Sequence, residues 1–299
     1  MSITFRSYNP EPLFGEDYYK LREFLIRLDS HNYHFGRWDW MITSGWLDKS
    51  SLPRIGLWEE NGELVALSTY DIRLDGKCFF PYKKGYEHLS SEMIRYAQEN
   101  LAKDGTVELL ICDGDMALQE AATNMGFIPT QKKDCDAIYP IDVDKISYAL
   151  PDGFKITSMA DTFDLYKYGQ VLWKGFNHEI NGEGAFSPDD DRNGIAGFDR
   201  PNVNLNLKIA VVAPNGDFVS YCGMWQDKAS KSALVEPVAT DPAYRRMGLG
   251  RAAVLEAVRR CGQLGAKRAF VGSSQQFYYS IGFRPYATST FWEKRVKGR

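Results

Sequence analysis

The stretch 241-DPAYRRMGLGRAAVLEAVRR-260 decides how the second half of this chain is expected to fold. It follows 232-SALVEPVAT-240, a short apolar run that is typical of a buried strand. The apolar residues that come next recur on one helical face, which predicts a helix over 249–263. Gly248 and Gly250 stand between the strand and the helix, where a backbone without Cβ atoms can approach a ligand closely.

The start of this helix is a candidate binding site for an anion. The first N–H groups of a helix have no intrahelical acceptor, and the helix dipole favours negative charge at that end. Arg245, Arg246 and Arg251 add positive charge beside the glycines. The segment 245–250, called the RRMGLG loop below, is therefore a candidate phosphate or pyrophosphate site, and the alternative is a helix start with ordinary surface arginines.

The two halves of the chain repeat the same landmarks in the same order. The repeated pairs are Asn61-Gly62 with Asn215-Gly216, 105-GTVELLIC-112 with 265-GAKRAFVG-272, and Gly126-Phe127 with Gly282-Phe283. Asn-Gly between two apolar runs is a strong hairpin signal. Three landmarks at nearly one offset indicate a duplicated domain, and the polar connection near 140–156 separates the copies into residues 1–147 and 148–299.

Each half is expected to run strand, helical region, hairpin, strand, helix, strand, helix, strand. This order predicts an α+β fold with a mixed, mostly antiparallel sheet flanked by helices. In the second half we expect strands near 208–213, 217–225, 232–240, 267–272 and 286–293, and helices at 249–263 and 274–280.

Composition is that of a globular protein. The chain has 299 residues, of which 44% are hydrophobic and 25% charged. Its five cysteines are scattered without a CxxC pair, so we expect neither a disulfide framework nor a metal site. Residues 149–299 carry 20 basic and 15 acidic side chains, an excess too small to indicate nucleic acid. We expect a cytoplasmic protein, monomeric or homodimeric, that does not bind membranes.

The spacing Arg245-x-x-Gly248-x-Gly250 resembles the R/Q-x-x-G-x-G/A motif of the GCN5-related N-acetyltransferase (GNAT) family. The segment 277-FYYSIGF-283 is similar to the Y-x-x-x-G-F ending common in that family. The resemblance implies two tandem acyl-CoA N-acyltransferase-like domains and acetyl-coenzyme A as co-substrate. The cofactor-binding residues that it implies are Val238, Ala239, Thr240, Arg245, Arg246, Met247, Gly248, Leu249, Gly250 and Arg251.

Acetyl transfer needs a neutral amine, a stabilised oxyanion and a proton for the departing thiolate. Tyr278 stands where the family usually carries its general acid, and the alternative is an aromatic core residue. Strand alternation predicts that Glu236 shares a face with Val238 and Thr240, where it could serve as a base. Equally, its carboxylate could simply pair with an arginine.

The segment 173–186 lies where this fold usually shapes the acceptor pocket. His178 and Glu179 are therefore candidate substrate-binding residues, although a structural histidine is the more common case. The aromatic stretch 33-YHFGRWDW-40 could line an acceptor pocket or form part of the core.

The first half lacks the glycines and the tyrosine of the candidate site in the second half. Aligned on the repeats, Gly248 and Gly250 fall on His88 and Ser90, and Tyr278 falls on Ala122. The first domain is thus expected to be a degenerate GNAT-like copy. The leading expectation is an N-acetyltransferase that acts on a primary amine of a small molecule. The alternatives are a catalytically silent coenzyme A sensor or partner-binding module, and a protein lysine acetyltransferase.

Overall fold

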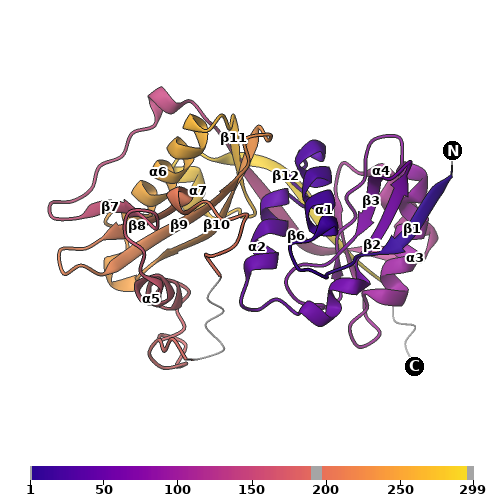
Figure 1. The fold of residues 1–299 in the computed structure, drawn as a ribbon, viewed down its shortest axis with the longest axis horizontal. Helices are drawn as coiled ribbons and strands as arrows, with labels where there is room; N and C mark the ends of the chain where they lie inside the picture. The colour runs from indigo at the N-terminus through magenta and orange to yellow at the C-terminus, as the bar shows by residue number, and fades with distance from the viewer. Residues whose placement is uncertain (1, 190–196, 295–299) are drawn as a thin grey trace.

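The computed structural model describes residues 2–189 and 197–294 and consists of two halves that lie side by side (Figure 1). The elements of the first half are β1 (Ile3–Ser7), α1 (Glu16–Leu28), α2 (Phe35–Thr43), β2 (Gly56–Glu60), β3 (Glu63–Ser68), β4 (Lys77–Cys78), α3 (Ser90–Asn100), β5 (Glu108–Cys112), α4 (Met116–Asn124) and β6 (Phe127–Pro140). Short 3-10 turns occur at Lys49–Arg54, Glu87–Leu89 and Val143–Lys145.

The described part of the second half follows a similar order, with the single helix α5 where the first half has α1 and α2. Its elements are β7 (Lys155–Ser158), α5 (Leu165–Gly175), β8 (Lys208–Val212), β9 (Phe218–Gln226), β10 (Ser232–Thr240), α6 (Leu249–Gln263), β11 (Arg268–Val271), α7 (Gln276–Ser280) and β12 (Arg284–Lys294), with 3-10 turns at Leu205–Leu207 and Pro242–Tyr244. The predicted helix over 249–263 is confirmed at both ends, and the predicted strands agree to within about two residues. Local periodicity was enough to find these elements because each depends on neighbouring residues.

The strands form two sheets, and the larger, mixed sheet runs through both halves. One sheet has the order β1-β2-β3, and the other has the order β4-β5-β12-β6-β11-β10-β9-β8-β7. Bridges Ala66–Tyr82 and Thr69–Phe79 join the two sheets at β3 and the segment after β4. Most pairs are antiparallel, whereas β4–β5 and β10–β11 are parallel. The predicted α+β class is confirmed.

The two halves exchange their last strands. β12 lies between β5 and β6, so that Phe291 pairs with Leu110 and Thr290 pairs with Lys133. β6 in turn pairs with β11 of the second half. In Figure 1 the yellow strand β12 runs into the indigo and magenta half. The predicted division at residue 147 lies in the connection between β6 and β7, but the sheets on either side share strands.

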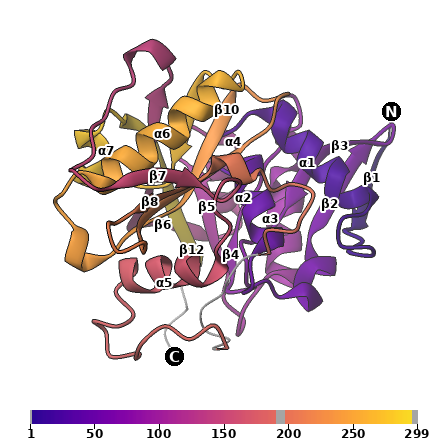
Figure 2. The ribbon, with the colours of Figure 1, turned by 60° about the vertical axis from the view of Figure 1, so that its left-hand side comes forward.

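Helices cover both faces of the sheet in the second half (Figure 2). α6 packs on one face over a core that includes Val254 and Val258, and α5 packs on the other face through Tyr168 and Val171. Within the described residues, no helix is both long and apolar enough to cross a membrane.

The first half encloses an aromatic core under α1 and α2. Tyr33, Phe35 and Trp38 of the 33–40 stretch belong to this core. Most of this stretch is therefore structural. Arg37 and Trp40 differ from the core residues, since both side chains lie next to the second half, as described below.

Candidate functional site

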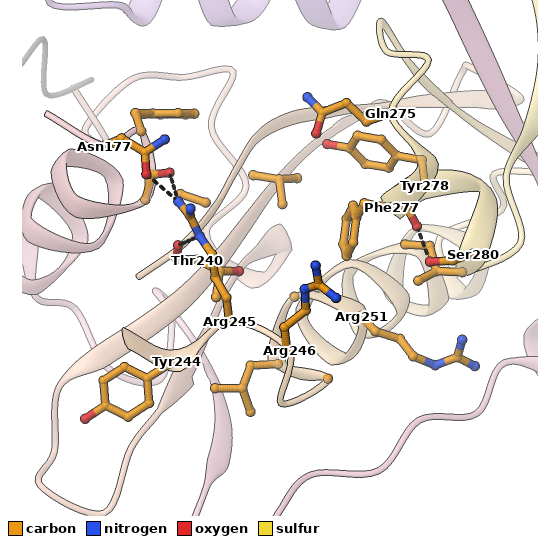
Figure 3. Close-up of a pocket in the computed structure, with 18 residues that line it drawn as sticks. Asn177, Thr240, Tyr244, Arg245, Arg246, Arg251, Gln275, Phe277, Tyr278 and Ser280 are labelled. Carbon is orange, nitrogen blue, oxygen red and sulfur yellow. Dashed lines mark hydrogen bonds between the residues drawn. The ribbon is translucent and has the colours of Figure 1, made fainter. Parts of the chain in front are cut away.

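A cleft of about 740 Å³ opens between β10, the start of α6, α7 and the end of α5 (Figure 3). The predicted residues that line it are Val238, Ala239, Thr240, Arg245, Arg246, Gly248, Leu249, Gly250, Arg251 and Tyr278. Lining residues that sequence reasoning missed are Gly175, Phe176, Asn177, Tyr244, Gln275, Phe277, Ser280 and Ile281. The RRMGLG loop and Tyr278, 28 or more residues apart in the chain, thus border the same cleft.

The two glycines of the loop act in different ways. Gly248 caps α6 with φ of 80°, and a Cβ built there would meet open space. Its conformation disfavours other residues, and it leaves the helix start uncovered. A Cβ on Gly250 would lie 3.1 Å from Thr240 Oγ1 and 3.3 Å from the ring of Phe277. Gly250 therefore lets the first turn of α6 pack tightly against β10 and α7.

The three arginines in and beside the loop also differ in their contacts and directions. The guanidinium of Arg245 donates to the carbonyl oxygens of Thr240 and Gly175 and, at 2.7 Å, to Asn177 Oδ1. Arg245 thus ties the end of α5 to the loop, a structural contact that the motif alone did not predict. Arg251 is directed away from the cleft and donates to the Ser147 carbonyl at 3.3 Å. Arg246 rises from the loop toward the cleft in Figure 3.

β10 and β11 diverge beside the cleft. Their ladder covers Ser232–Leu234 and Arg268–Phe270, after which β10 continues to Thr240 along β9. Peptide groups of β10 beyond residue 234 consequently face the opening between the strands. Such an edge can accept an extended ligand as if it were an additional strand.

Tyr278 lies at the inner side of the cleft, with its side chain only 8% exposed. Its neighbour Tyr279 packs against the core beside α6 and is outside the described lining of the cleft. Burial, with smaller effects from Cys222 and Glu236, raises the pKa of the Tyr278 phenol above its usual value. The phenol therefore stays protonated at neutral pH and can donate a proton.

The prediction that Glu236 shares a face with Val238 and Thr240 is wrong. A bulge interrupts β10 between Val235 and Val238, where two residues oppose Gly223 alone. An inserted residue reverses the alternation of side chains beyond it. Val238 and Thr240 consequently face α6 and α7, whereas the Glu236 carboxylate turns toward α2 on the other face.

Glu236 is held by the first half of the chain. Its Oε2 atom accepts from Arg37 Nη1 at 2.9 Å, and the same guanidinium donates to Asp71. Arg37 also stacks on Trp40, with its Cζ atom 4.5 Å from the ring centre. Removal from solvent raises the pKa of the Glu236 carboxyl, although Arg37 acts against that shift. The sequence left open whether Glu236 pairs with an arginine, and the structure shows that it pairs with Arg37 of α2.

His178, Glu179 and Met247 lie outside the described lining of the cleft. His178 stacks on Trp173 with ring centres 4.2 Å apart, and its Nδ1 atom is 2.9 Å from Glu183. It thereby stabilises the loop after α5. Glu179 lines a separate hollow of about 430 Å³ next to Lys174, and Met247 is 40% exposed.

The equivalent helix start of the first half carries carboxylate side chains. A carboxylate oxygen of Glu87 accepts from the Gly85 amide at 3.0 Å, and Glu92 of the first turn of α3 accepts from Trp58 Nε1 at 2.7 Å. Carboxylates therefore occupy the helix start where the second half has glycines and arginines. Ala122 is completely buried in α4. Negative side chains at this helix start would repel an anionic ligand.

Comparison with known proteins agrees with this geometry. Residues 177–283 match the model of the Acetyltransferase (GNAT) family. Curated proteins gave no sequence match. Among solved structures, the chain is similar to a GCN5-related N-acetyltransferase from Sphaerobacter thermophilus, with a TM-score of 0.59, 13% identity, and coverage of 98% of this chain and 95% of that one.

Two further structures extend the likeness. A tandem GNAT protein from the clavulanic acid biosynthesis pathway has a TM-score of 0.58 and 11% identity, and both chains are covered completely. An N-myristoyltransferase from Saccharomyces cerevisiae has a TM-score of 0.54 and 12% identity, with 98% of this chain and 80% of that chain covered. At these identities the likeness concerns the fold. The match over residues 177–283 shows a GNAT acetyltransferase domain in the second half, and the fold of the whole chain is similar to that of the tandem GNAT protein.

Proposed function

We propose that this protein transfers the acetyl group of acetyl-coenzyme A to a primary amine of a small molecule. The observation that supports the proposal is the cleft itself, because it joins the Gly248-capped start of α6 to a buried tyrosine whose pKa is raised. The pyrophosphate would lie at the amides of the RRMGLG loop with Arg246 beside it. The pantetheine arm would follow β10 where it diverges from β11.

The chemical step follows from the groups around this opening. The amine nitrogen attacks the thioester carbonyl, and the amide of Val238, next to the bulge, is the candidate donor to the oxyanion. The C–S bond then breaks, and the Tyr278 phenol donates its proton to the coenzyme A thiolate. Glu236, on the opposite face of β10, is the candidate base for the ammonium proton, directly or through water.

Wild type, Tyr278→Phe and Tyr279→Phe should be compared in an assay that measures coenzyme A release from acetyl-coenzyme A with a panel of small amines. We expect Tyr278→Phe to lower kcat by about 10²–10⁴-fold, the usual contribution of general acid catalysis. The matched change Tyr279→Phe should be nearly neutral, because Tyr279 packs beside α6.

Binding of coenzyme A should be measured on the same variants by calorimetry. Tyr278→Phe should still bind it, because the phenol oxygen is assigned to the chemical step. If Tyr278→Phe turns over normally, the general acid is another group. If wild type binds the coenzyme and acetylates no amine in the panel, the sensor alternative is favoured, and acetylated peptides in place of small amines would favour a protein lysine acetyltransferase.

A further inference from the structure

Trp225 of β9 is hydrogen-bonded to the backbone of β10 at its bulge. The indole Nε1 atom donates to the Glu236 carbonyl oxygen at 3.0 Å, and the residue is buried, with 4% exposed. The bulge places Glu236 and Pro237 opposite Gly223 alone. Because Pro237 has no N–H group, it cannot donate to the ladder between the two strands. The indole therefore adds a contact at a point where the ladder has lost a donor.

Gly223 is a second residue that shapes the bulge. A Cβ atom built on it would lie 2.5 Å from the Glu236 carbonyl oxygen and 3.1 Å from Pro237 Cδ. Such distances are shorter than ordinary van der Waals contact, so the bulge can lie against β9 because this position has no side chain. Gly223 and Trp225 thus act on the same carbonyl oxygen, since one leaves space for it and the other donates to it.

The bulge decides where the Val238 amide points. The Asp241 amide donates to the Val219 carbonyl of β9 at 3.0 Å. Successive amides of a strand alternate between its two sides, so the Ala239 amide also faces β9, whereas the Val238 amide faces the opening toward β11. Without the extra residue, Val238 would stand opposite Tyr221, the present partner of Ala239, and its amide would face β9.

The indole ring of Trp225 is held from two directions. Gly36 of α2 lies so close that a Cβ atom there would be 2.8 Å from Trp225 Cβ. The Nζ atom of Lys208 lies 3.4 Å from the centre of the Trp225 ring and donates to the Met224 carbonyl at 3.0 Å. Trp40 of α2 packs against the same cluster. A ring packed in this way has little freedom to rotate, so its N–H stays directed at the bulge.

We propose that Trp225 is a positioning residue for acetyl transfer, because its N–H fixes the bulge that turns the Val238 amide toward the thioester carbonyl. This role rests on the function proposed above, in which that amide stabilises the oxyanion. Trp225 acts through the Glu236 carbonyl and the backbone of β10. Helix α2 of the first half, which packs on Trp225, then helps to keep the catalytic strand in shape.

The first test compares the kinetics of Trp225→Phe, which removes the N–H donor and retains an aromatic ring. We expect kcat for amine acetylation to fall by about 10–100-fold, since a small misplacement of a catalytic group can cost about 10² in rate. The dissociation constant of coenzyme A should change by less than about twofold, because the RRMGLG loop is untouched. A loss of binding in proportion to kcat would overturn the proposal.

Trp58→Phe is the matched control. It removes an indole that is equally buried and donates to Glu92 in the first half. Any general cost of losing a buried indole hydrogen bond should appear in this variant as well. We expect its kcat to equal that of wild type, and a loss of kcat equal to that of Trp225→Phe would overturn the proposal.

The second test uses infrared difference spectroscopy of bound acetyl-coenzyme A, isotopically labelled at the acetyl carbonyl, without an amine. An amide that donates to the carbonyl weakens the C=O bond. We therefore expect the stretching frequency to fall on binding to wild type and Trp58→Phe, and to fall less with Trp225→Phe. Gly223→Ala keeps the indole and displaces the Glu236 carbonyl, so it should behave like Trp225→Phe and replaces it if that variant does not fold. An equal frequency in all of these proteins overturns the proposal.

The role of Trp225 and the amine acetylation can fail separately. If no amine is acetylated but the carbonyl frequency falls in wild type and not in Trp225→Phe, the amine acceptor is wrong and the role of Trp225 stands. If wild type and Trp225→Phe acetylate amines at equal rates, the proposed function stands and the role of Trp225 is wrong.

Discussion

Arg37 and Glu236, which are 199 residues apart, meet at 2.9 Å between the two halves of the molecule. The first half thus supplies the partner of the only acidic residue on β10. Its loss of the glycines and the tyrosine does not make it a passive copy. It controls the electrostatic environment of the candidate base.

Replacing Arg37 should change the pH dependence of the reaction. In Arg37→Met, the Glu236 carboxyl loses the cation that opposes the effect of burial, so its pKa should rise further. We expect the acid limb of kcat/KM to move upward by about one pH unit or more. Asp227→Asn is the control, because it breaks another contact between the halves, the Arg22–Asp227 ion pair. An unchanged profile in Arg37→Met would exclude Glu236 as the base.

The glycines of the RRMGLG loop should be essential for coenzyme A binding. Gly250→Val would drive its side chain into Thr240 and Phe277, and Gly248→Val would strain a residue at φ of 80°. We expect calorimetry to show at least tenfold weaker binding for each variant, which corresponds to about 1.4 kcal/mol. His88→Val and Ser90→Ala in the first half are the matched controls and should bind normally. Weakened binding in these controls would indicate a site in the first half.

Arg246 and Arg245 should have separable effects. Arg246→Met should weaken binding of coenzyme A but leave binding of S-acetylpantetheine, which lacks the pyrophosphate, nearly unchanged. Arg245→Met should weaken both ligands, because it releases the end of α5 from the loop. Arg251→Met should have little effect, since its side chain points toward Ser147. If Arg246→Met weakens both ligands equally, the phosphate assignment is wrong.

Glu256 should make stability sensitive to acid. Its carboxylate accepts from Arg259, Arg260 and Tyr148, and these bonds overcome burial to lower its pKa to about 2. A lowered folded-state pKa stabilises the protein above pH 4.5, and this contribution is lost as the pH falls toward 2. The difference in unfolding free energy between wild type and Glu256→Gln should shrink over that range. The exposed change Glu120→Gln should show no such dependence.

Lys208 should also make stability rise with pH, but at higher pH and because burial of its charge is unfavourable. Its side chain is 2% exposed, donates to the Met224 carbonyl and lies over the Trp225 ring. Burial lowers its pKa to about 7, so unfolding takes up a proton between pH 7 and 10.5 and stability rises with pH there. Lys208→Met should raise the unfolding free energy by about 1–3 kcal/mol below pH 7, with less gain at pH 10. Exposed Lys228→Met is the control, and an equal gain there would contradict the assignment.

The elements of the second half could be predicted because they rest on local patterns. The apolar periodicity after Gly248 fixed α6 at both ends, and Asn215-Gly216 marked the hairpin between β8 and β9. The RRMGLG loop and Tyr278 were found by spacing, and the structure brings them to one cleft.

Other features depend on contacts between distant residues. The bulge at Glu236 cannot be read from alternation, because one extra residue reverses the face without changing the apolar pattern. Arginine and histidine are common ligand-binding residues. In this structure, however, Arg245 is hydrogen-bonded to Asn177 and His178 to Glu183. The exchange of β6 and β12 could not be predicted either. Equivalent strands of a repeat have similar sequence patterns, so each of these two strands could pair in the sheet position of the other.

That exchange has a consequence for the order in which the chain is made. Residues 284–294 leave the ribosome after everything that precedes them, yet they form the strand between β5 and β6. The first half therefore emerges with a gap in its sheet. The edges of β5 and β6 that face this gap have no partner strand until β12 has been translated. The two copies, although duplicated, can complete their folding only as one unit.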